Sequence, residues 1–120
     1  MKRLLLSLLV ATLVLAVAAP VLAQDPGHSC PHDDISIVDL RACIEHAIAM
    51  GHIDNPGIGN SLLAKVDAAQ TALDNEQPTV AAHILGALIE AIEAQSSKHI
   101  GAAHASHLAT HTQQVIDTLS

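Results

Sequence analysis

Residues 55–96, NPGIGNSLLAKVDAAQTALDNEQPTVAAHILGALIEAIEAQS, contain two apolar stripes separated by one short polar turn. The first stripe recurs at helical spacing from an Asn55-Pro56 start to about Asp74, and consists of Ile58, Leu62, Val66, Ala69 and Leu73. Asn55 is a good N-cap, and a proline suits the first helical turn. After a turn at 75–77, Pro78 opens a helix to about Ser96, with an apolar face of Ile84, Leu85, Leu88, Ile89 and Ile92. The stretch therefore predicts a helical hairpin.

The sequence on either side of this hairpin predicts two more helices. Residues 37–50 follow a cap at Ser36 or Asp34, end at Gly51, and carry a stripe of Ile37, Leu40, Ile44, Ala47 and Ile48. Residues 102–119 follow a break at 97–101, with an inward face of Leu108, Thr112, Val115, Ile116 and Leu119. Since no segment alternates as a strand does, we expect an all-α domain over residues 35–120, a small antiparallel four-helix bundle.

Residues 1–23 are typical of a secretory signal peptide. A basic start of Lys2 and Arg3 precedes an apolar run at 4–19, and the small residues at 20–23 predict cleavage after Ala23. The alternative is an uncleaved membrane anchor, but the run is shorter than the roughly 20 residues that cross a bilayer. We therefore expect a secreted or periplasmic protein with no membrane association after cleavage.

The composition of the remaining 97 residues limits the function. Loss of Lys2 and Arg3 leaves three of the five Lys and Arg residues against all twelve Asp and Glu, a net charge of −9 with histidine neutral. Such a charge repels nucleic acid and anionic membranes. The sequence contains no Phe, Tyr or Trp, so it offers no aromatic platform for stacking sugars or bases. The core must be aliphatic.

Two cysteines, Cys30 and Cys43, predict one disulfide in an oxidising compartment. Residues 24–34 are polar, with prolines and a glycine, and predict an extended arm that the disulfide ties to the first helix. The alternative is a zinc site, because His28, Cys30 and His32 alternate in the arm and Cys43 and His46 are three residues apart on one helical face. Both interpretations stay open at this point.

A second group of histidines, His104, His107 and His111, falls within about 60° of arc on the last predicted helix. Neutral imidazoles at this spacing can bind zinc, copper or nickel, most simply as a pair with a partner from elsewhere. The alternative is a polar, half-exposed border of the apolar face. Protonation of all nine histidines would offset the charge of −9, so we also expect solubility or self-association to change between pH 7 and pH 5.

The chain from Gly51 to Leu119 resembles the FIMAH domains, small helical modules of secreted bacterial and archaeal proteins. The residues that carry the resemblance are Ile53–Ile58 (IDNPGI), Ser61–Ala69 (SLLAKVDAA), Ala81-Ala82, Leu85, and Glu93–Ile100 (EAQSSKHI). The resemblance implies a non-catalytic accessory role beside exported, often polysaccharide-active, proteins. Its density on the second and third helices makes their surface the expected interface, with Lys65, Lys98 and His99 as tentative contact residues.

Catalytic motifs are missing from the sequence: it has no HExxH, no glycine-rich phosphate loop, no EF-hand spacing and no CxxC. We therefore expect no enzyme activity and no cofactor. The favoured function is a secreted interaction module that binds another exported protein or an extracellular polymer. The alternative is a periplasmic or extracellular metal-binding protein that uses its histidines to hold zinc, copper or nickel.

Overall fold

The computed structural model describes Cys30 and residues 34–120, so the predicted signal peptide and most of the predicted arm lie outside the described residues. Four helices form: α1 (Ile37–Ala49), α2 (Pro56–Asp74), α3 (Pro78–Gln95) and α4 (Ala102–Thr118). The expected all-α fold is confirmed. The helices α1, α3 and α4 end one residue earlier than expected, because Met50, Ser96 and Leu119 are their C-caps.

The starts of α1 and α2 follow from side-chain caps that the sequence supplies. The Ser36 hydroxyl accepts a hydrogen bond from the backbone N–H of Asp39 at 3.1 Å, so Ser36 and not Asp34 is the N-cap of α1. The Asn55 side chain accepts from two backbone N–H groups at the start of α2, at 2.9 and 3.2 Å. Beyond α1, Gly51 has φ +79°, a conformation that glycine adopts without a steric penalty.

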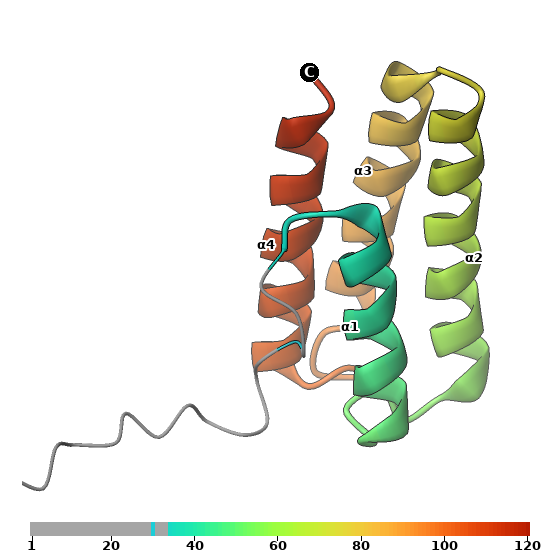
Figure 1. The fold of residues 1–120 in the computed structure, drawn as a ribbon. Helices are drawn as coiled ribbons and strands as arrows, with labels where there is room; N and C mark the ends of the chain where they lie inside the picture. Colours follow the sequence, from blue (N-terminus) through green and yellow to red (C-terminus); the bar gives the residue numbers. More distant parts are fainter. Residues whose placement is uncertain (1–29, 31–33) are drawn as a thin grey trace, which may run out of the picture.

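Each helix packs against two others, in the cyclic order α1–α2–α3–α4. Figure 1 shows the α2–α3 turn at one end of the bundle and the α1–α2 and α3–α4 connections at the other end. The centre is aliphatic, and its largest fully buried hydrophobic side chains are Leu40, Ile44, Leu62, Val66, Leu85, Leu88, Ile92, Ile100, Leu108 and Val115. Since every helix contributes to this one core, burial of its apolar stripe stabilises each helix in place.

Two backbone contacts join the loops at the end of the bundle where α1 leads into α2. The N–H of Asp54 donates to the carbonyl of His99 at 3.0 Å, and the N–H of Gly101 donates to the carbonyl of His52 at 3.2 Å. Ile53 and Ile100, both buried, form an isolated antiparallel bridge between them. The α1–α2 and α3–α4 loops are thereby held to each other.

Across Cys30 and residues 34–120, no helix combines the length and hydropathy that spanning a bilayer requires.

Candidate functional site

The sulfur atoms of Cys30 and Cys43 lie 2.01 Å apart, at disulfide distance, as the sequence predicts. Cys43 is buried in the middle of α1, and Cys30 belongs to the segment that precedes it. The bond therefore holds Cys30 against α1. The neighbouring histidines of the predicted arm, His28 and His32, lie outside the described residues, so their part in the zinc alternative is not tested.

Two histidines of α4 lie against these sulfurs. Nε2 of His107 is 3.1 Å from Sγ of Cys30. Nδ1 of His111 is 3.5 Å from Sγ of Cys43 and 3.9 Å from Sγ of Cys30. Because His107 and His111 are one helical turn apart, both rings reach the same place, with their planes at 81° and their centroids 6.4 Å apart. We call Cys30, Cys43, His107 and His111 the sulfur–histidine cluster.

His111 is the buried member of this cluster, with 7% of its surface exposed. Burial lowers its pKa below the ordinary value of 6.5, and the nearby His107 lowers it further, while Asp39 and a backbone hydrogen bond at Asp34 act in the opposite direction. Its Nε2 is buried, with no hydrogen-bond partner in the described part of the chain. The ring is therefore held neutral, with Nδ1 directed at sulfur. The sequence suggested a half-exposed position for it; the arm residue Cys30 and the disulfide cover it instead.

His46 and His104 adjoin the cluster. Together with both cysteines and His107 they line a cavity of about 10 Å³, room for one water-sized particle. The ring of His104 also stacks on His52, with centroids 3.6 Å apart. The structure thus brings His46 of the first predicted metal group beside His104 and His107 of the second. Helical spacing could not predict this meeting, because it depends on how α1 packs against α4.

The three tentative interaction residues do not converge. The ammonium group of Lys65 donates to the Ser61 hydroxyl one turn earlier on α2, at 3.2 Å. His99 and Lys98 lie in the α3–α4 loop, where Nδ1 of His99 is 2.8 Å from Oδ1 of Asp54. Lys98, His99 and Asp54 help to line a hollow of about 300 Å³. Lys65 is thus separate from the other two.

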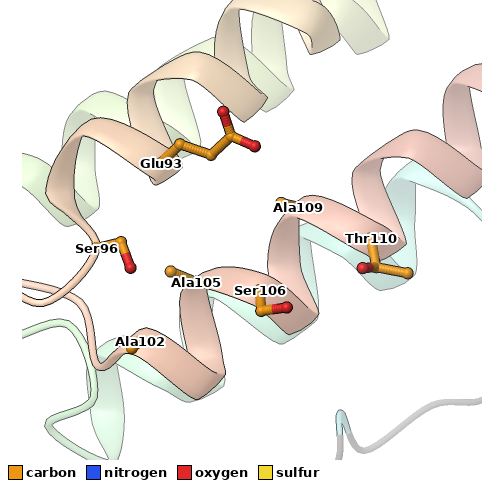
Figure 2. A pocket seen from close by; sticks show the side chains of 7 residues that line it. All are labelled: Glu93, Ser96, Ala102, Ala105, Ser106, Ala109 and Thr110. Atoms are coloured by element: carbon orange, nitrogen blue, oxygen red, sulfur yellow. The ribbon is translucent and has the colours of Figure 1, made fainter.

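A groove of about 420 Å³ runs between α3 and α4 (Figure 2). Glu93 and Ser96 lie on the α3 side, and Figure 2 shows them facing the α4 residues Ala102, Ala105, Ser106, Ala109 and Thr110. Alanines at 102, 105 and 109 leave the space open, and hydroxyl groups line it. A smaller hollow, of about 150 Å³, lies between α2 and α3 and involves Ile58, Ser61, Ala91 and Ala94. Sequence analysis missed the groove; its only signal is the row of small residues on one face of α4.

The FIMAH domain model matches residues 37–117, from the first residue of α1 almost to the end of α4. The chain belongs to the FIMAH domain family. No curated protein and no solved structure matches the chain. The FIMAH match includes Cys43, His107 and His111 but begins after Cys30. The disulfide therefore ties a residue outside the matched segment onto the FIMAH domain.

Proposed function

We propose that this FIMAH domain is an exported accessory module that binds a polypeptide segment of another exported protein and catalyses no reaction. Export through cleavage after Ala23 and an antiparallel order of the four helices are parts of the same proposal. The observation that carries it is the α3–α4 groove, whose volume of about 420 Å³ falls within the range typical of ligand sites, roughly 300–1,000 Å³.

The lining of the groove suits an extended peptide. The Ser106 and Thr110 hydroxyls can donate to carbonyl groups or accept from N–H groups of a bound chain, and the alanines allow its backbone to approach closely. The Glu93 carboxylate and the overall negative charge favour a segment that carries a cationic side chain. A sugar polymer is the less favoured ligand, because the chain has no Phe, Tyr or Trp ring to stack on a pyranose face.

The His99–Asp54 pair is the arrangement nearest to a catalytic one. An aspartate on Nδ1 is the order found in hydrolytic triads, and Ser97 lines the same hollow. However, among the hydrogen bonds of Cys30 and residues 34–120, none joins the Ser97 hydroxyl to the His99 ring. The side chains of His99 and Asp54 are also 44% and 62% exposed, so water competes for their contact. These features support a structural link between loops rather than a reaction centre.

The test is an affinity experiment in which the domain, without residues 1–23, is immobilised and exposed to a mixture of exported proteins. The proteins retained by the wild type are compared with those retained by two tryptophan variants. Ser106→Trp fills the groove, whereas Ala103→Trp places the same ring on an exposed position of α4 that does not line it. We expect a discrete exported protein to be retained by the wild type and by Ala103→Trp, and to be lost with Ser106→Trp.

Retention that survives Ser106→Trp would refute the groove as the binding site. Retention of polysaccharide instead of protein would assign the module to a polymer. Circular dichroism of both variants shows whether the helices are intact, so that loss of binding is separated from loss of fold.

A further inference from the structure

The sulfur–histidine cluster has a chemistry that the groove does not use. We propose that reduction of the Cys30–Cys43 disulfide converts this cluster into a Zn²⁺ site whose ligands are the two cysteine sulfurs, Nε2 of His107 and Nδ1 of His111. This differs from both ligand sets that the sequence suggested, because it takes one sulfur from the arm, one from α1 and both nitrogens from α4.

The ligand atoms are already close to the positions that zinc requires. With Zn–S bonds of about 2.3 Å and Zn–N bonds of about 2.0–2.1 Å, neighbouring ligand atoms in a tetrahedral site lie about 3.5 Å apart. Three of the four sulfur–nitrogen pairs of the cluster, Cys30–His107, Cys43–His111 and Cys30–His111, are separated by 3.1, 3.5 and 3.9 Å. One ligand atom each from Cys30, His107 and His111 lies within 4.8 Å of the others. The two sulfurs are closer than this only because they are covalently bonded.

Reduction supplies the fourth ligand and the charge. A dithiol reductant transfers two electrons and two protons, the S–S bond breaks to give two cysteine thiols, and the reductant becomes a disulfide. Zn²⁺ then displaces one proton from each thiol, and the two thiolates balance the charge of the ion. The two neutral imidazoles complete a Cys₂His₂ set. In the oxidised protein neither sulfur is a thiolate, so the cluster lacks its two anionic ligands.

The surroundings favour a single, ordered ion. Histidines one turn apart on a helix can bind the same metal, and His107 and His111 have this spacing. The neutral imidazole of His111 lies with Nδ1 3.5 Å from Sγ of Cys43 and 3.9 Å from Sγ of Cys30, so this nitrogen already faces both sulfur ligands. The small cavity beside the sulfurs provides space into which they can separate, and His46 and His104 line its other sides. The helices α1 and α4 pack directly on each other and hold these groups in place.

The experiment is a Co²⁺ titration of the processed protein, oxidised and after reduction with a phosphine, under anaerobic conditions. Co²⁺ substitutes for zinc and reports tetrahedral thiolate ligation by its visible and charge-transfer absorption, in a chain with no aromatic side chains to mask the ultraviolet region. We expect one equivalent to bind the reduced protein with this spectrum, to be displaced by Zn²⁺, and not to bind the oxidised protein.

Substitutions assign the nitrogen ligands. We expect His107→Ala and His111→Ala to weaken binding by more than about 100-fold, because changes beyond the ligands themselves already cost about 10- to 100-fold. His83→Ala, at an exposed position on α3, is the matched control and should bind as the wild type does. Circular dichroism shows whether each variant folds. If the variant of buried His111 does not fold, the variant of half-exposed His107 still tests whether the α4 histidines are the nitrogen ligands.

Three results would overturn the proposal. The first is no stoichiometric binding after reduction. The second is equally tight binding to the oxidised protein, which would make the site a histidine site without sulfur. The third is thiolate binding that survives loss of the His107 ring, which would place the nitrogen ligands elsewhere, for example at His28 or His32 in the arm.

Discussion

At the scale of single residues, His111 occupies a position that the pattern of α4 reserves for an aliphatic side chain. It lies between Leu108 and Val115 in sequence, all three are buried, and the adjacent Thr112 hydroxyl is satisfied by the Leu108 carbonyl at 2.7 Å. Among Cys30 and residues 34–120, no group hydrogen-bonds to Nε2 of His111. The fold thus places a titratable ring where protonation would put a charge beside a hydrophobic core, and the opposing effect of Asp39 offsets only part of the cost.

The lowered pKa of His111 predicts that the oxidised protein loses stability on acidification. The unfolded chain binds a proton at His111 near pH 6.5, whereas the folded protein binds it only at lower pH. The stability that neutral His111 provides to the folded protein is therefore fully present above pH 6.5. It is lost as the pH falls from there through the folded-state pKa. Urea midpoints of the wild type should fall between pH 7 and pH 5 by more than those of His111→Gln. Parallel pH profiles would contradict this assignment.

The identity of the residues near the sulfurs was only partly predictable. The Cys30–Cys43 pairing follows from the presence of two cysteines in a chain whose sequence predicts export, and the shared face of His107 and His111 follows from helical geometry. The burial of His111 does not follow from either, because it depends on a contact with Cys30, which lies 81 residues away in the sequence. Periodicity in a single sequence does not record such a long-range contact.

At the scale of helices, two glycines within helices should respond in opposite ways to substitution by alanine. A Cβ at Gly86 in α3 meets no atom within 4 Å, so Gly86→Ala should gain the helix propensity of alanine, about 0.5–1 kcal/mol. A Cβ at Gly59 in α2 would lie 2.7 Å from Cδ1 and 2.9 Å from Cγ1 of Ile48 in α1. That clash should cancel or reverse the same gain. Urea denaturation of both variants tests this, and a Gly59→Ala protein more stable than Gly86→Ala would refute it.

The helices themselves were predictable to within a residue at each end, since caps and glycines mark them chemically. Asn55, Pro56 and Gly51 each act as their residue types suggest. The α3–α4 groove was not predictable, because its depth depends on which small side chains of two helices face each other across the contact. Periodicity identifies the face that a helix buries, but it does not give the rotation and height at which two buried faces meet.

For the whole molecule, the disulfide predicts a large loss of stability on reduction in the absence of metal. It closes a loop with a sequence separation of 13, for which the chain-entropy model gives about 3 kcal/mol. The urea midpoint should therefore fall when a phosphine is added to the wild type, while a Cys30→Ser variant should already have the lower midpoint and not respond to the phosphine. Zn²⁺ added to the reduced wild type should recover part of the loss if the cluster binds it.

The histidine content predicts a change in association with pH for the exported protein. Histidine is the side chain that gains charge between pH 7 and pH 5, and the sequence has nine histidines and a net charge of −7 with histidine neutral, so acidification weakens the repulsion between molecules. The buried His111 contributes least to this change, because its pKa is lowered. Sedimentation velocity should show larger species at pH 5 than at pH 7, with raised salt reducing the difference between the two. An unchanged sedimentation profile over this range would exclude the effect.

The disulfide also determines where mechanical load enters the fold. Any tension that arrives along the chain from before Cys30 passes through the sulfur bond to Cys43, in the middle of α1, and largely bypasses the first turn at Ile37. A pull at a helix end unwinds one turn after another, whereas a pull at the middle must shear the helix from both of its neighbours, α2 and α4, at once. The oxidised domain should therefore need a higher force to unfold under such tension than the reduced domain, in which unfolding would start at the N-terminal end of α1.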